Sequence, residues 1–104
     1  MWILEAGEET GAGPVTFRLP TGATKTLGRA PRVDFILDAA LVSRVHCRLS
    51  ATESGLEVLD LDSTNGTFVN GERITRAMLK PGDRLTVGRV ELTVSHAAPP
   101  ADPR

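Results

Sequence analysis

Three short segments of the chain gather side chains that readily bind an anion. They are Gly28-Arg29, Ser43-Arg44-Val45-His46 and Ser63-Thr64-Asn65-Gly66-Thr67. These segments supply guanidinium groups, hydroxyls and a carboxamide, all of which donate hydrogen bonds, and the planar guanidinium of Arg can bind phosphate through two bonds at once. The set suits a phosphate attached to a peptide, and it lacks the groups that bond cleavage requires.

The closeness of Ser43 and His46 raises an alternative, a hydrolase in which His46 serves as the base for a Ser43 nucleophile. The sequence has no Gly-x-Ser-x-Gly elbow and no acid placed to orient His46, which argues against it. His46, Cys47 and the distant His96 do not have the spacing of a metal site. We therefore predict no catalytic residue, no metal and no cofactor, and we interpret His46 as a structural residue that braces neighbouring loops.

The bulk properties indicate one ordinary globular domain. The chain has 104 residues, of which 40% are hydrophobic, and this is enough for a single core. Its net charge of −1 and its pI of about 6.1 argue against a duplex nucleic-acid binder, which usually carries a basic face. A single cysteine, Cys47, excludes an internal disulfide and favours an intracellular location. No apolar run approaches the roughly 18 residues of a membrane span, and the first residues do not resemble a signal peptide.

Short apolar runs separated by Gly and Pro predict strands rather than helices. Ten Gly and seven Pro interrupt the chain, and Leu56 and Val58 alternate with Glu57 as in a half-buried strand. Many short strands between turn signals are typical of a β-sandwich or a barrel. The expected strands cover residues 2–6, 15–19, 24–27, 35–37, 46–51, 56–61, 67–69, 84–87 and 90–95.

Local sequence also predicts the connections. Asn70-Gly71 is typical of a type I′ hairpin turn, and Lys80-Pro81-Gly82-Asp83 fits a type II turn. Gly88-Arg89 is expected to join two strands tightly, and residues 38–42 have room for one helical turn. The Pro-rich residues 97–104 are predicted to form a disordered tail.

Taken in order, the three segments resemble the motifs of the forkhead-associated (FHA) family of phosphothreonine-binding domains. The family pattern is Gly-Arg, then Ser-x-x-His, then Ser-x-Asn-Gly-Thr and then a further Asn-Gly, which Asn70-Gly71 supplies here. Residues 79–85 also match the family's Leu-x-x-Gly-Asp-x-Leu stretch. The resemblance covers roughly residues 2–95, and one departure is Cys47, where the family often has Ala.

The resemblance implies an all-β fold, an eleven-stranded β-sandwich of two sheets of the FHA/SMAD-like type, with ligand loops at one end. It places the domain at residues 1–96 and the tail at 97–104. It also implies a role for each matching residue: phosphate binding for Arg29, Ser43 and Thr64, peptide-backbone binding for Arg44 and Asn65, and loop scaffolding for Gly28, His46 and Gly66.

The implied function is a phosphopeptide-binding module that recognises phosphothreonine in Ser/Thr-kinase signalling. Its expected partner is a phosphothreonine-containing protein, either a Ser/Thr kinase or a substrate of one, and we expect a monomer that binds neither nucleic acid nor membrane. An FHA-fold scaffold or oligomerisation domain that no longer reads phosphate is the alternative. The compact chain favours a bacterial, cytoplasmic protein, although its start also resembles nibrin-type DNA-repair adaptors, which would be nuclear. Thr10, in an acidic segment, is a candidate self-regulatory phosphosite.

Overall fold

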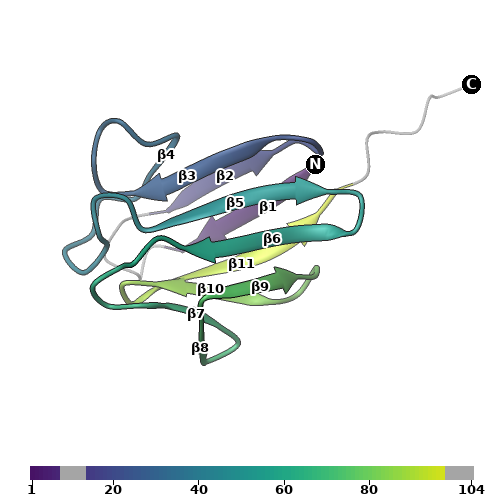
Figure 1. Cartoon of the computed structure of the whole chain (residues 1–104). Coiled ribbons are helices and arrows are strands. Elements are labelled where there is room, and N and C mark those ends of the chain that lie inside the picture. The colour runs from purple at the N-terminus through teal and green to yellow at the C-terminus, as the bar shows by residue number, and fades with distance from the viewer. Residues whose placement is uncertain (8–13, 98–104) are drawn as a thin grey trace, which may run out of the picture.

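The computed structural model describes residues 1–7 and 14–97, and every regular element in these residues is a β-strand (Figure 1). Six strands form one sheet, in the order β2-β1-β11-β10-β7-β8, and five form the other, in the order β4-β3-β5-β6-β9. The predicted all-β, eleven-stranded sandwich is confirmed. The strands are β1 (Trp2–Ala6), β2 (Val15–Leu19), β3 (Thr24–Gly28), β4 (Phe35–Ile36), β5 (Cys47–Thr52), β6 (Gly55–Asp60), β7 (Thr67–Val69), β8 (Glu72–Ile74), β9 (Arg76–Leu79), β10 (Arg84–Val87) and β11 (Val90–His96).

The hydrophobic core lies between the two sheets and follows from alternation along the strands. In β11, Val90, Leu92 and Val94 are buried, whereas Glu91 and Thr93 are exposed. Fully burying one such aliphatic side chain stabilises the fold by about 1.5–3 kcal/mol. The other buried apolar residues include Leu4, Leu19, Leu27, Leu37, Val42, Cys47, Leu49, Leu56, Val58, Leu79, Leu85 and Val87.

Two expectations about local structure are wrong. The sequence did not predict β9, in which Leu79 is the one fully buried residue, so that the strand carries little apolar signal. Residues 38–42 form no helical turn. Instead, the amide of Val42 donates to the carbonyl of Ala39 at 3.1 Å in an isolated turn. Because β4 is only two residues long, the chain between β3 and β5 is mostly loop.

The predicted turns have the expected backbone geometry. Asn70 and Gly71 have φ values of 50° and 87°, as a type I′ turn between β7 and β8 requires. Gly82 has a φ of 94°, and the amide of Asp83 donates to the carbonyl of Lys80 at 3.0 Å, as in a type II turn. The first of these turns joins two paired strands of the six-stranded sheet, and the second carries the chain from β9 in the five-stranded sheet to β10 in the six-stranded sheet.

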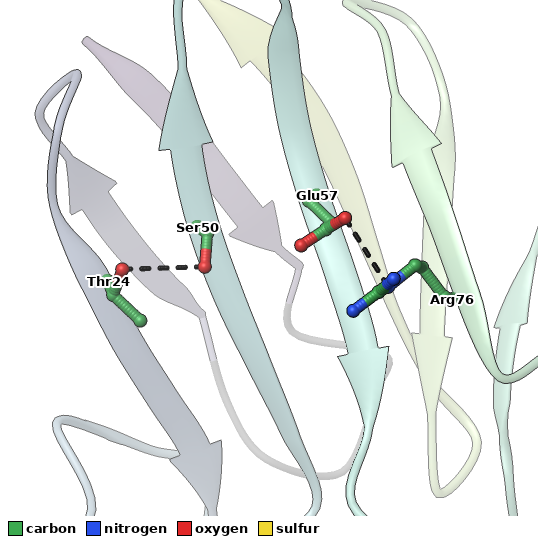
Figure 2. A network of polar contacts seen from close by, with 4 residues as sticks. All are labelled: Thr24, Ser50, Glu57 and Arg76. Carbon is green, nitrogen blue, oxygen red and sulfur yellow. Dashed lines mark hydrogen bonds and ion pairs between the residues drawn. The ribbon is translucent and has the colours of Figure 1, made fainter.

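The outer face of the five-stranded sheet carries polar links between strands (Figure 2). The hydroxyl of Thr24 on β3 donates to that of Ser50 on β5 at 3.4 Å, and the two residues are direct partners in the sheet register. The Nε of Arg76 on β9 lies 3.4 Å from an oxygen of Glu57 on β6. An exposed ion pair of this kind contributes at most about 1 kcal/mol.

The sandwich has two distinct ends. The β3–β4, β4–β5 and β6–β7 loops lie together at the left of Figure 1, while the N-terminus lies at the right. At that right-hand end, Trp2 of β1 pairs with His96 of β11, and the amide of Ala97 donates to the carbonyl of Met1 at 2.9 Å. Thr10 and residues 98–104 of the predicted tail lie outside the described residues.

Candidate functional site

The chain following β3 packs directly against the β4–β5 loop. The amide of Arg29 donates to the carbonyl of Ser43 at 3.0 Å, and the amide of Ala30 donates to the carbonyl of Arg44 at 3.1 Å. These two backbone bonds hold the segment that follows β3 against the β4–β5 loop. The first two sequence segments are therefore joined through their backbones.

The third segment, on the β6–β7 loop, is tied to the second by side chains. The amide of Thr64 donates to the Oγ of Ser43 at 3.0 Å, and the Nδ2 of Asn65 donates to the carbonyl of Leu41 at 2.9 Å. Thr64 and Asn65 are both exposed, while Ser43 is half-buried. The structure thus brings Arg29, Ser43, Thr64 and Asn65 together at one end of the sandwich.

His46 lies at the centre of the loop cluster and is completely buried. Its Nδ1 accepts a hydrogen bond from the amide of Ser43 at 3.0 Å, so the proton of the neutral ring is on Nε2. That Nε2 donates to the carbonyl of Gly66 at 2.9 Å. One imidazole therefore satisfies two backbone groups on two different loops.

This arrangement leaves His46 without the geometry of a catalytic base. Both ring nitrogens are engaged by backbone groups, and neither faces the Oγ of Ser43, which instead accepts from Thr64. A Ser–His nucleophile requires a hydrogen bond between the hydroxyl and the ring. The geometry of these residues argues against the hydrolase alternative.

The two arginines of the cluster present their charges to solvent. Arg29 is exposed, and its Nε donates to the carbonyl of Val42 at 3.0 Å, which fixes the direction of its guanidinium group. Arg44 is also exposed. Because the bond to Val42 holds only the Nε of Arg29, its two terminal nitrogens have no partner in residues 1–7 and 14–97 and can bind a ligand from a fixed position.

Asp60, which the sequence analysis missed, holds the β6–β7 loop in shape. Its carboxylate accepts from the Ser63 hydroxyl at 2.5 Å, the Ser63 amide at 3.2 Å and the Thr67 hydroxyl at 2.7 Å. The Ser63 hydroxyl in turn accepts from the amide of Gly66 at 3.0 Å. The Asp-x-x-Ser spacing could have indicated this role of Asp60, because Asp side chains commonly bond nearby backbone amides in turns.

These contacts shift the acidity of Asp60. Burial raises the pKa of its carboxyl, but hydrogen bonds from Ser63 and Thr67 outweigh burial, so that the pKa lies below its ordinary value of 3.8. A lowered folded-state pKa means that the ionised carboxylate stabilises the fold above about pH 3.8. This contribution is lost as the pH falls through the lowered pKa.

We therefore expect Asp60→Asn to lower the free energy of unfolding by about 2 kcal/mol at neutral pH, since bonds to a charged group are lost. The difference from wild type should shrink as the pH falls through the lowered pKa of Asp60. Urea unfolding across the acid range measures both effects. Asp38→Asn, which removes an exposed carboxylate, serves as the control. A difference that persists unchanged in acid would contradict the role given to Asp60.

Glycine is required where the loops approach most closely. A Cβ on Gly28 would lie 2.1 Å from the carbonyl oxygen of Arg44, so no side chain fits there without displacing the β4–β5 loop. Gly66 has a φ of 91°, a conformation that side chains disfavour. Gly88, in the β10–β11 turn, also approaches the β4–β5 loop, and a Cβ there would lie 2.4 Å from the carbonyl carbon of Leu41. Gly88 is a further support of the site that sequence reasoning missed.

The structure shows no sign of thiolate chemistry at Cys47. Its side chain is fully buried beside the loop cluster, and burial raises its pKa to about 12, with the charge of Asp60 adding to the effect. The thiol is therefore protonated at neutral pH and packs as a small apolar group.

In residues 1–7 and 14–97, no group of three or more His, Cys, Asp or Glu residues is placed to hold a metal ion, and no helix could cross a membrane.

Comparison with known proteins identifies the family. Residues 25–88, which contain all three loop segments, match the FHA domain. The chain belongs to the FHA family. This FHA domain is similar to one solved in a structural and functional analysis of phosphothreonine-dependent FHA domain interactions, with a TM-score of 0.81 and 29% identity over 93% of this chain and 97% of that one.

Two curated relatives of this FHA domain come from bacteria. It is 44% identical over 80 residues to the ABC transporter ATP-binding/permease protein Rv1747 of Mycobacterium tuberculosis, a match that covers 77% of this chain and 9% of the relative. It is 41% identical over 69 residues to the oxoglutarate dehydrogenase inhibitor of Corynebacterium efficiens, covering 66% of this chain and 49% of the relative. The chain thus spans less than half the length of each of these two relatives.

Proposed function

We propose that this FHA domain binds phosphothreonine-containing segments of partner proteins in Ser/Thr-kinase signalling. The observation that carries the proposal is the meeting of Arg29, Ser43 and Thr64 at one end of the sandwich, held by hydrogen bonds between their loops. The likeness to an FHA domain with phosphothreonine-dependent interactions supports it. The match to the FHA domain and the relative named as an inhibitor support a binding module rather than an enzyme.

The chemistry of the loop cluster fits a phosphate. Such a group carries about −1.5 to −2 charges at pH 7 and offers strong acceptor oxygens. Arg29 would donate from its free terminal nitrogens. The Ser43 hydroxyl accepts from Thr64 through its oxygen, which leaves its own proton to donate to the phosphate, and the exposed Thr64 hydroxyl would add a further donor.

The peptide backbone would be bound beside the phosphate. Asn65 uses one amide N–H on Leu41, which leaves its oxygen and its second N–H for a peptide bond of the ligand. Arg44 is exposed next to Ser43 and can donate to a peptide carbonyl. Gly28, His46 and Gly66 would act as scaffolding that fixes these groups before the ligand arrives.

The proposal extends to the setting of the domain. We place its boundary at residues 1–96, since β11 ends at His96, with 97–104 as a tail. The bacterial relatives favour a cytoplasmic protein that acts with a Ser/Thr kinase or its substrate. The net charge of −1 favours a protein partner over nucleic acid or a membrane surface, and we expect a monomer.

Calorimetry with three forms of one peptide, selected from a degenerate phosphothreonine library, tests the proposal. We expect the phosphothreonine form to bind, the unphosphorylated form to show no measurable binding, and the phosphoserine form to bind about tenfold or more weakly. The last effect follows because a missing methyl group in a fitted pocket costs about 1–3 kcal/mol. Equal binding of the phosphothreonine and phosphoserine forms would contradict threonine selectivity. Equal binding of the unphosphorylated form would contradict the proposal as a whole.

A further inference from the structure

A second positively charged feature adjoins the proposed phosphate site. A groove of about 540 Å³ runs between the β3–β4 and β4–β5 loops, and its lining residues are Arg29, Ala30, Pro31, Arg32, Arg44 and Val45. Two of its three arginines belong to the proposed phosphopeptide site, but Arg32 does not. The groove is therefore continuous with the site and extends it by one additional cation.

Among the described residues no acidic side chain lines this groove, so no carboxylate of this part of the chain balances its three positive charges. In residues 1–7 and 14–97 the single ion pair joins Arg76 to Glu57, on the outer face of the five-stranded sheet (Figure 2). Asp34 follows Arg32 closely in sequence, but its carboxylate accepts from the amide and the hydroxyl of Thr26, at 2.9 and 3.2 Å. Arg32 and Arg44 thus have no carboxylate partner among the described residues.

The walls between these cations are apolar. Pro31 and Val45 both line the groove, and Val45 is 44% exposed, which is high for a side chain of this kind. An apolar wall between guanidinium groups suits the methylene stem of an acidic side chain, whose charged end then reaches the cations. Three like charges in one groove repel one another, and an anion placed among them relieves that repulsion.

We propose that this groove binds a second anionic side chain of the same phosphorylated segment, either a carboxylate or a second phosphate, and that Arg32 is the residue that selects it. This inference rests on the proposed function, because the groove shares Arg29 and Arg44 with the proposed phosphopeptide site. It specifies the ligand class as phosphothreonine with a neighbouring negative charge. The guanidinium fork of Arg32 pairs with either kind of anion.

Fluorescence anisotropy with a phosphothreonine peptide of neutral flanks tests the proposal. In one series a single Glu is moved along the peptide one position at a time, and in a second series phosphoserine replaces the Glu. We expect one position at which the added charge raises affinity by about three- to tenfold, and the gain should decrease as salt is added. The series with the larger gain identifies the preferred anion.

Two variants connect the gain to the groove. The affinity for the peptide with the added negative charge is divided by the affinity for the neutral peptide. This ratio should fall towards one in Arg32→Ala and below one in Arg32→Glu. Arg18→Ala removes an equal charge from exposed β2, where Arg18 pairs with Ile3, and should leave the ratio as in wild type. A ratio that falls equally in Arg18→Ala would overturn the proposal, because the effect would then come from net charge alone.

The outcomes separate this inference from the proposed function. If the neutral phosphothreonine peptide binds and no added charge at any position raises affinity, the groove proposal fails and the phosphothreonine proposal stands. If Arg32→Ala retains the full gain, the anion binds elsewhere and the groove proposal again fails. If no phosphothreonine peptide binds in either series, both proposals fail together.

Discussion

Replacing Arg29 by alanine is expected to lower phosphothreonine-peptide affinity about 100-fold or more and to leave the fold intact. Charge-assisted hydrogen bonds contribute about 1.5–3 kcal/mol each, and the two free terminal nitrogens of Arg29 can make two of them. The side chain is exposed, and its bond to the carbonyl of Val42, the one that it makes to the described residues, is worth about 1 kcal/mol. Binding should therefore suffer far more than stability.

Calorimetry and thermal unfolding of the same samples separate these two effects. Arg29→Lys keeps the charge but loses the fork, so its affinity should lie between those of wild type and Arg29→Ala. Arg84→Ala removes an exposed arginine from β10 and is the matched control for net charge. Unchanged affinity in Arg29→Ala would remove this residue from the phosphate site.

Replacing Gly28 by alanine is expected to damage both stability and binding. The added Cβ would lie 2.1 Å from the carbonyl oxygen of Arg44 and 2.7 Å from its carbon, so the β4–β5 loop must move. That movement breaks the bonds from Arg29 and Ala30 to this loop and displaces Ser43. We expect a loss of about 3 kcal/mol, which lowers the melting temperature of a domain of this size by about 15 °C.

The control for this substitution is Gly22→Ala. Gly22 has a φ of 92°, so alanine is strained there, but no atom lies within 4 Å of the new Cβ. It should cost about 1 kcal/mol and leave peptide affinity unchanged, because the β2–β3 turn lies at the far end of the sandwich. Wild-type stability and affinity in Gly28→Ala would show that the loops tolerate the displacement.

The sequence predicted the parts of the fold that depend on local patterns. The alternation of apolar and polar residues located most of the central strands. Two turns were predicted because Asn70-Gly71 and Gly82 tolerate the positive φ values that type I′ and type II turns require. β9 was missed because an edge strand with one fully buried residue shows little periodicity. Helical propensity at residues 38–42 was overridden by the loop that they form against the rest of the site.

The site residues were predictable as a set, but the contacts between them were not. Residue types and order indicated which segments belong together, while the partners of His46, on Ser43 and Gly66, depend on a fold that brings two loops to one imidazole. Asp60 was overlooked because it belongs to a strand and acts through Ser63 and Thr67. The close approach of Gly88 to Leu41 joins two sheets, which no local sequence pattern encodes.

The pairing of Met1 with Ala97 places the point where the chain enters the domain beside the point where it leaves. Both points lie at the opposite end of the sandwich from the β3–β4, β4–β5 and β6–β7 loops. Neighbouring termini allow a domain to be inserted into a surface turn of another protein with little distortion of the host. In such a fusion the three loops would face away from the host protein, because both connections to the host lie together at the other end of the sandwich.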